Sequence, residues 1–178
     1  MKFIVDPCHV EEPCLQPGEA PSEYVVRAAR LKVREVCNRH LCGFVIGADT
    51  VVVVENMILG KPAGRDDGRS MLRRLSGKWH EVVSGVCLFD CESRRMRSAA
   101  SRSRVHFRRL TREEIEWYLD TGEYRDKAGA YAIQGYASLF VDRIEGCYFN
   151  IVGLPLTVFR KLCRQLGIEL FRELQDSP

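Results

Sequence analysis

An aspartate and a lysine stand out in the stretch from Phe44 to Pro62, FVIGADTVVVVENMILGKP, which is otherwise mostly apolar. Its β-branched residues predict a strand, a tight turn and a second strand. Asp49 lies in the first apolar run, where a carboxylate is costly unless it is hydrogen-bonded, paired with a cation or bound to a metal. Lys61 returns a cation on the second strand. This hairpin is therefore predicted to be a site of chemistry.

The register of the hairpin decides what Lys61 faces. A turn at residues 55–56 sets Lys61 opposite Thr50 in an antiparallel pair. A loop one residue longer sets it opposite Val51, on the same face as Asp49. Both registers leave the acid and the cation within reach of one site.

A second lysine lies on a predicted helix that runs from about Glu23 to Asn38. Ser22 is its expected N-cap, and Glu23 suits the first turn. Lys32 falls on the apolar stripe of this helix, which is formed by Val25, Ala29 and Val36. Its ammonium either extends past the apolar neighbours to solvent or points into a bordering cleft, and the spacing allows both.

The chain before this helix contains a pair of acids. Residues 2–5, KFIV, are predicted to form a short strand, and a loop rich in proline and glycine follows. Glu11 and Glu12 lie in that loop. From position alone, a solvated acidic loop is the favoured interpretation of both residues.

The rest of the chain predicts alternating helices and strands. A helix begins near Asp66 or Asp67 as the cap and ends before Gly77. A mostly buried strand is predicted from Trp79 to Phe89, and His80 at its start is interpreted as structural rather than as a ligand. Thr111 opens a capping box. Its helix ends at Gly122, and a last amphipathic helix begins with Pro155 at N1, with Phe159, Leu162 and Leu166 facing the core.

Two further segments have unusual compositions. The run DKAGAYAIQG is rich in small residues that permit close backbone approach, and Lys127 and Gln134 are its polar points. Residues 94–109 carry seven arginines and no acid. This pattern suggests nucleic acid, but Val105 and Phe107 alternate with polar residues as in a half-solvated strand, and no aromatics are interleaved for base stacking. A nucleic-acid partner is not expected.

The composition is that of a single globular domain. The chain has 178 residues, of which 46% are hydrophobic and 29% charged, with a net charge of +3. No apolar run approaches the roughly 20 residues that span a bilayer, and the N-terminus does not have the pattern of a signal peptide. Eight cysteines show no zinc spacing and are interpreted as reduced thiols, several of them buried. We expect a cytoplasmic protein.

Four stretches together resemble one family. GADTVVVVENMILGKP, MLRRLSGKWHEVVSGV, DKAGAYAIQG and IEGCYFNIVGLPL are similar, in order and spacing, to signature blocks of the Maf, or septum-formation-protein-like, nucleotide pyrophosphatases. The resemblance runs from about residue 3 to residue 170. It implies an elongated α/β fold with a mixed central sheet, flanking helices and two lobes around a cleft, similar to the inosine-triphosphate pyrophosphatases.

The resemblance also implies a reaction and its residues. The reaction is hydrolysis of a nucleoside triphosphate between the α- and β-phosphates, with Mg²⁺ or Mn²⁺ as the cofactor. Asp49 matches the catalytic aspartate, the proton acceptor. Glu12 matches the second acid of an early Asp-Glu pair, with Glu11 in place of the usual aspartate. Lys32 and Lys61 match substrate-binding lysines, and Glu12 is expected to bind substrate as well. Glu12 and Asp49 are the expected metal ligands.

Two positions indicate the subgroup. Thr50, directly after Asp49, and Gln134 in YAIQG resemble the members that act on dTTP and UTP, and both are predicted to bind substrate and set specificity. A glutamine amide both donates and accepts, which suits the O4, N3–H and O2 edge of a pyrimidine. Modified pyrimidine nucleotides are also possible substrates, and the family suggests a homodimer.

One departure from the family opens an alternative. Family members begin with a strand and a Ser-x-Ser-Pro-Arg-Arg turn that binds nucleotide, and no such motif is present here. We therefore expect residues 1–178 to form one Maf-like domain that is truncated at the N-terminus. The alternative function is a catalytically impaired protein of the same fold that binds nucleotide or acts as a regulator.

Overall fold

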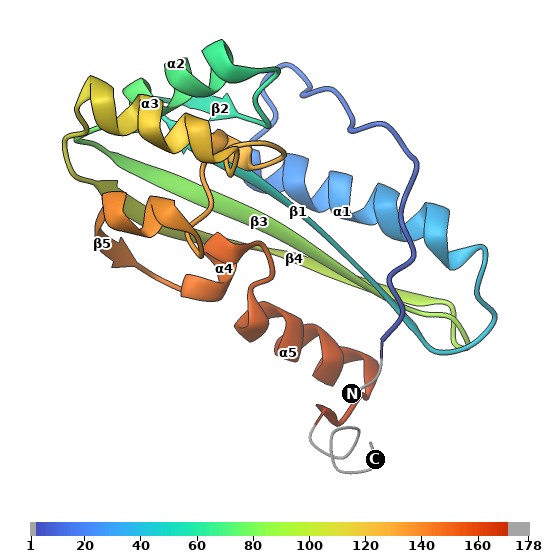
Figure 1. The fold of residues 1–178 in the computed structure, drawn as a ribbon. Helices are drawn as coiled ribbons and strands as arrows, with labels where there is room; N and C mark the ends of the chain where they lie inside the picture. The colour runs from blue at the N-terminus through green and yellow to red at the C-terminus, as the bar shows by residue number, and fades with distance from the viewer. Residues whose placement is uncertain (1–2, 171–178) are drawn as a thin grey trace. The chain divides into compact units, whose positions relative to one another are not determined.

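The central element of the fold is a five-stranded sheet with the strand order β2-β1-β3-β4-β5. This computed structural model describes residues 3–170 (Figure 1). Both pairings for which the register is given, β1 with β2 and β4 with β5, are antiparallel. The strands are β1 (Phe44–Val54), β2 (Met57–Leu59), β3 (Trp79–Asp90), β4 (Arg95–Phe107) and β5 (Val141–Glu145).

Helices flank this sheet, so the predicted α/β class is confirmed. The α-helices are α1 (Pro21–Cys37), α2 (Arg65–Leu75), α3 (Arg112–Thr121), α4 (Tyr148–Val152) and α5 (Leu156–Leu166). Two short 3₁₀ helices, η1 (Ala128–Ala130) and η2 (Tyr136–Phe140), lie in the segment rich in small residues and directly after it.

The residues group into two compact units. Unit 1 comprises Met1–Asp49, Gly85–Ser101 and Leu154–Pro178, and unit 2 comprises Thr50–Ser84 and Arg102–Gly153. Strands β1, β3 and β4 contribute residues to both units. Each unit has its own apolar core.

In unit 1, helices α1 and α5 cover opposite faces of β3 (Figure 1). Side chains alternate between the two faces of a strand. Cys87 and Phe89 pack with α1, whereas Val86 and Leu88 pack with α5. The near-continuous apolar run of β3 is explained by this arrangement, because both of its faces are buried.

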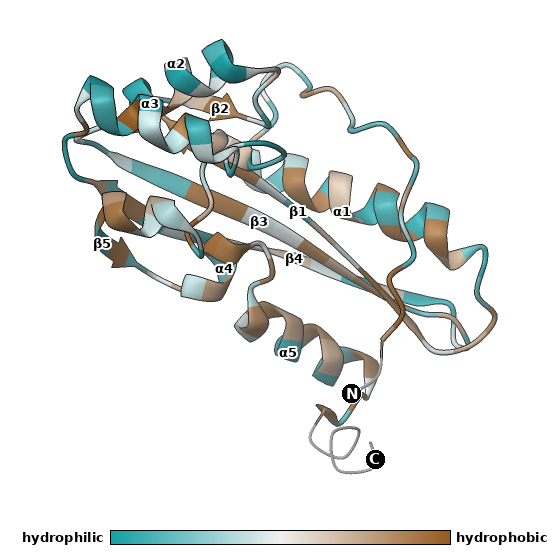
Figure 2. Cartoon of the chain, in the orientation of Figure 1, coloured by the Kyte–Doolittle hydropathy of each residue, from teal (hydrophilic) through white to brown (hydrophobic). Residues whose placement is uncertain are grey.

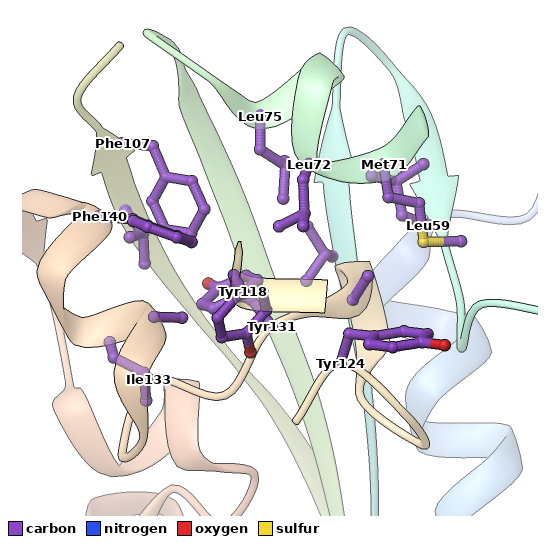
Figure 3. Packing of buried hydrophobic residues seen from close by; sticks show 14 of the residues in the cluster. Leu59, Met71, Leu72, Leu75, Phe107, Tyr118, Tyr124, Tyr131, Ile133 and Phe140 are labelled. Atoms are coloured by element: carbon purple, nitrogen blue, oxygen red, sulfur yellow. The ribbon is translucent and has the colours of Figure 1, made fainter. Parts of the chain in front are cut away.

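In unit 2, α2 and α3 both contribute side chains to an aromatic-rich core, part of which is seen in Figure 3. Phe140 lies between the rings of Phe107 and Tyr118, with ring centroids 6.0 and 5.3 Å away. Hydrophilic residues prevail on the visible side of α2 in Figure 2, while its Met71, Leu72 and Leu75 are buried. The helix is therefore amphipathic, as its sequence predicts.

The hairpin has the two-residue turn. Glu55 and Asn56 have φ values of 51° and 62°, which is the conformation of a type I′ turn, and Val52 pairs with Leu59. The first of the two registers is thus confirmed. The prediction of a second strand reaching Pro62 is wrong, since β2 ends at Leu59. Beyond it, the Gly60 carbonyl accepts a hydrogen bond from the Gly129 amide at 2.9 Å.

The strand predicted at residues 2–5 is also wrong for residues 3–5, and residue 2 lies outside the described part. Phe3, Ile4 and Val5 are exposed and adopt no regular structure. A strand needs a neighbour for its backbone hydrogen bonds, and none of the strands described pairs with this segment.

Helix starts differ from the prediction by one to three residues. Helix α1 has Ala20 rather than Ser22 at the N-cap, because Pro21 takes N1 and Glu23 accepts a hydrogen bond from the Ala20 amide. Neither Asp66 nor Asp67 caps α2, whose N-cap is Gly64. Pro155 is the N-cap of α5 rather than its first residue. The capping box at Thr111 and the end at Gly122 are confirmed for α3.

The cysteines and the arginine-rich segment have structural surroundings. All eight cysteines are free, and Cys37, Cys87, Cys91 and Cys163 are buried. Three arginines of residues 94–109 pair with acids at 2.7–3.2 Å: Arg102 with Glu81, Arg104 with Glu145 and Arg108 with Glu114.

His80 is buried and contacts Tyr131 Oη through Nε2 at 3.0 Å. Within residues 3–170, no helix is long and apolar enough to cross a membrane.

Candidate active site

Helix α1 packs against two strands of unit 1 through glycines. A Cβ on Gly85 of β3 would lie 2.4 Å from the Val25 carbonyl carbon, and one on Gly47 of β1 would lie 2.7 Å from a Val33 methyl carbon. The backbones approach this closely only because neither strand residue carries a side chain. This contact fixes the helix face that carries Lys32.

Lys32 and Asp49 form an ion pair at the core of the site. The Lys32 ammonium lies 2.5 Å from Asp49 Oδ1. The Asp49 side chain is 7% exposed and that of Lys32 is 27% exposed. Lys32 therefore does not extend to solvent, and the ammonium stabilises a carboxylate that would be costly to bury without such partners.

Glu12 also approaches the same ammonium. Its Oε1 lies 4.0 Å from Lys32 Nζ, and its side chain is 44% exposed. Both Glu11 and Glu12 are exposed, as the interpretation of a solvated loop predicts. Glu12 nevertheless approaches Lys32, because the loop is held next to α1 on both sides of Glu12.

Both ends of the loop are tied to α1 or to the residues just after it. Asp6 contacts Arg39 at 3.1 Å and His40 at 2.7 Å, two residues that follow the end of α1 at Cys37. Arg27 donates to the Cys14 carbonyl at 2.9 Å and pairs with Glu19. Two attachment points, one before and one after Glu12, thus hold an irregular segment next to the helix.

Tyr24 is a member of the site that sequence reasoning missed. Burial and the negative charges of Asp49 and Glu12 raise the pKa of its hydroxyl above the usual value. Tyr24 and Lys32 are eight residues apart on α1, a spacing that puts both on one helix face. That spacing was the available signal.

Thr50 faces different partners from its neighbour Asp49. Consecutive strand residues point to opposite faces. Thr50 Oγ1 lies 2.8 Å from Ser84 Oγ on β3 in unit 2, whereas Asp49 contacts α1 in unit 1. Asp49 and Thr50 therefore have separate surroundings, although a single peptide bond joins them.

Lys61 and Gln134 lie in unit 2 and are both exposed. Lys61 follows the end of β2, next to the backbone contact between Gly60 and Gly129. Gln134 lies in the turn that precedes η2. The structure thus brings Lys32, Asp49 and Glu12 together in unit 1, and places Thr50, Lys61 and Gln134 in unit 2.

The sequence model of one family, described as Maf-like protein, matches residues 1–166. The chain belongs to the Maf-like protein family. Curated relatives of this Maf-like protein include three named dTTP/UTP pyrophosphatase. The protein from Geotalea uraniireducens is 46% identical over 167 residues, which are 94% of this chain and 86% of the relative. The Syntrophomonas wolfei protein is 44% identical over 156 residues, with 88% and 82% covered. The Pyrococcus furiosus protein is 41% identical over 170 residues, with 96% and 87% covered.

The oxygens around Lys32 fit a divalent cation of the kind that the Maf resemblance implies. Glu12 and Asp49 each present a carboxylate oxygen within 4.0 Å of one ammonium. Mg²⁺ is commonly bound by one or two carboxylates together with substrate phosphates. Within residues 3–170, no group of three or more His, Cys, Asp or Glu side chains could hold an ion by protein ligands alone.

Proposed function

We propose that this Maf-like protein is a nucleoside triphosphate pyrophosphatase that acts on dTTP and UTP. The observation that carries the proposal is the cluster in which the Lys32 ammonium contacts both Asp49 and Glu12. The names of the relatives support the substrate class. The reaction consumes one water and gives the nucleoside monophosphate and pyrophosphate.

In this proposal Asp49 is the proton acceptor. It is a carboxylate held in a low-exposure position on a rigid strand, and it accepts a proton from the attacking water. Lys32 orients Asp49 in the resting protein through the 2.5 Å contact. It also supplies positive charge for the phosphate oxygens, on which charge develops during displacement.

Glu12 and Asp49 would hold Mg²⁺ or Mn²⁺ together with phosphate oxygens of the substrate. When bound, the cation polarises the phosphoryl oxygens and neutralises part of their charge. Lys61 is proposed as a further phosphate contact, on the basis of the motif that it shares with the family. Thr50 and Gln134 are proposed to select the pyrimidine, since a hydroxyl and an amide can hydrogen-bond its polar edge.

A substrate panel tests the activity. The wild-type protein is incubated with dTTP, UTP, CTP, dATP and dGTP and with Mg²⁺ or Mn²⁺, and the products are separated by chromatography. We expect monophosphate and pyrophosphate in equal amounts, fastest from dTTP and UTP. Nucleotide binding without any pyrophosphate would support the alternative, a catalytically impaired protein of the same fold. Diphosphate and orthophosphate as products would contradict cleavage between the α- and β-phosphates.

Two further predictions concern the setting of the activity. The free cysteines suit a reducing compartment, and we propose the cytoplasm on this ground. The homodimer suggested by the family resemblance stays a prediction, for which light scattering after gel filtration is the measurement.

A further inference from the structure

A chain of hydrogen bonds runs from Thr50 into the interior of unit 2. Thr50 Oγ1 lies 2.8 Å from Ser84 Oγ, and Ser84 Oγ donates to the Asn150 carbonyl at 2.9 Å. Thr50 is half-buried, whereas Ser84 and Asn150 are completely buried. The hydroxyl of Thr50 is therefore the outer end of a buried polar chain.

Asn150 anchors the inner end. Its Nδ2 donates to the Val82 carbonyl at 2.9 Å and to Ser103 Oγ at 3.1 Å. The main-chain carbonyl of Asn150, which Ser84 contacts, also accepts a hydrogen bond from the Gly153 amide at 3.1 Å. A fully buried residue held by these contacts keeps its carbonyl in one place, so the direction of the Ser84 hydroxyl is fixed as well.

The direction of each hydrogen bond in the chain follows from counting protons. A serine hydroxyl has one proton, and a carbonyl oxygen only accepts. Since Ser84 donates its proton to Asn150, it has to accept the proton of Thr50. Thr50 Oγ1 then has no proton left for a ligand and presents only lone pairs.

An acceptor at this position discriminates between pyrimidines. Uracil and thymine carry a hydrogen on ring nitrogen N3, which donates, whereas N3 of cytosine is itself an acceptor. We propose that Ser84 is a positioning residue, which holds the Thr50 hydroxyl as an acceptor and so makes the site prefer uracil and thymine over cytosine. This inference rests on the proposed function, in which Thr50 helps to select the base.

The variant Ser84→Ala tests the inference. It releases the Thr50 proton, which can then turn to donate to N3 of cytosine. The Asn150 carbonyl keeps the Gly153 amide as its partner, so the change leaves that acceptor satisfied. We expect the ratio of kcat/KM for UTP to that for CTP to fall about 10-fold, in line with the loss of one hydrogen-bond preference.

Two further variants separate positioning from damage to the fold. Ser103→Ala removes another buried hydroxyl that contacts Asn150 but not Thr50, and it should leave the ratio unchanged. Thr50→Val removes the acceptor itself and should lower the ratio. In the Thr50→Val background, Ser84→Ala should have no additional effect on the ratio.

The outcomes distinguish this inference from the proposed function. If the wild-type protein released no pyrophosphate from any triphosphate, the proposed function itself would be contradicted. A wild-type protein that is active on UTP, with a ratio unaffected by Ser84→Ala or by Thr50→Val, would overturn the inference and leave the activity standing. An equal decrease in the ratio of kcat/KM for UTP to that for CTP in Ser103→Ala and Ser84→Ala would also overturn the inference.

Discussion

At the scale of single residues, the pair of Lys32 and Asp49 decides whether the site can exist. The Asp49 side chain is 7% exposed, so its charge has lost most of its contact with water. Removing one partner of such a pair leaves a poorly solvated charge, which costs more than the pair itself contributes. Loss of the contact between Lys32 and Asp49 should therefore lower the stability of the fold as well as the activity.

The variant Lys32→Met should lower the free energy of unfolding by about 2 kcal/mol, because Asp49 loses the ammonium while remaining mostly buried. Urea denaturation at neutral pH measures this change. The double variant with Asp49→Asn should recover part of the loss. Lys78→Met, which breaks the exposed pair with Glu55, serves as the matched control and should have little effect. Equal losses from both lysine variants would contradict the importance assigned to burial.

The sequence predicts the residue types of the site better than their surroundings. Asp49 is identifiable as an unusual acid in an apolar strand, and Lys32 as a cation on an apolar stripe. The spacing of Lys32 could not decide between solvent and a partner, since its partner lies 17 residues away and is brought close only by packing. Glu12 was harder to place because an irregular loop has no periodicity from which to infer where it packs.

At the scale of elements, the close contact of α1 with β3 holds the helix that carries Lys32 and Tyr24. The contact depends on Gly85, where a Cβ would lie 2.4 Å from both the carbon and the oxygen of the Val25 carbonyl. These are backbone atoms, so the neighbour cannot move aside by changing a rotamer. The strand pattern gave no sign of this requirement, because a glycine within a strand can equally mark a bulge or a tight bend.

The variant Gly85→Ala should therefore destabilise the protein by about 3 kcal/mol, because α1 has to shift away from β3. Urea denaturation measures the loss. Gly60→Ala is the matched control, because a Cβ there would meet no atom within 4 Å. A Gly85→Ala protein as stable as the control would show that α1 does not depend on this contact.

The types of the elements could be predicted from local sequence patterns. The positions at which elements end could not be predicted where they depend on contacts with distant residues. The capping box at Thr111 was predictable because it is encoded by adjacent residues, whereas the turn at Glu55 and Asn56 was one of two alternatives that the sequence allowed. The end of β2 at Leu59 was not predictable in this way, and directly after it Gly60 bonds to Gly129, which is distant in the sequence. The segment 3–5 has the apolar composition of a strand, but none of the strands in residues 3–170 pairs with it.

At the scale of the whole molecule, stability in acid depends on a histidine in the core of unit 2. His80 is buried against Phe107 and Tyr131, with ring centroids 4.9 and 5.4 Å away. Burial lowers the pKa of His80 to about 4. The folded state therefore keeps this ring neutral at a pH where the unfolded chain, with a pKa of about 6.5, binds a proton.

The sign of the effect follows from this difference. The contribution of His80 to stability is complete above pH 6.5 and is lost as the pH falls from about 6.5 to about 4, where the unfolded state binds more protons. The loss amounts to about 3 kcal/mol. His80→Gln should flatten this part of the dependence of the unfolding free energy on pH, measured by urea denaturation between pH 4 and 7.5. Identical slopes for the wild type and the variant would contradict a neutral buried histidine.

Acids contribute at lower pH and do not obscure this window. Hydrogen bonds from Arg69 and Arg65 lower the pKa of Glu116 to about 2. Its stabilising effect is lost as the pH falls below about 4.5 toward 2, mostly below the range in which His80 titrates. The difference between the wild type and His80→Gln isolates the histidine in any case, because both proteins contain Glu116.

The central claim is that Asp49 accepts a proton in the hydrolysis of dTTP and UTP. The most direct measurement is the rate of pyrophosphate release from UTP with saturating Mg²⁺, compared between the wild type, Asp49→Asn and the control Asp142→Asn. Asp142 is an exposed acid on β5. The account predicts a loss of at least about 100-fold for Asp49→Asn with the fold retained, and no change for the control. Pyrophosphate release by Asp49→Asn at the wild-type rate would contradict it.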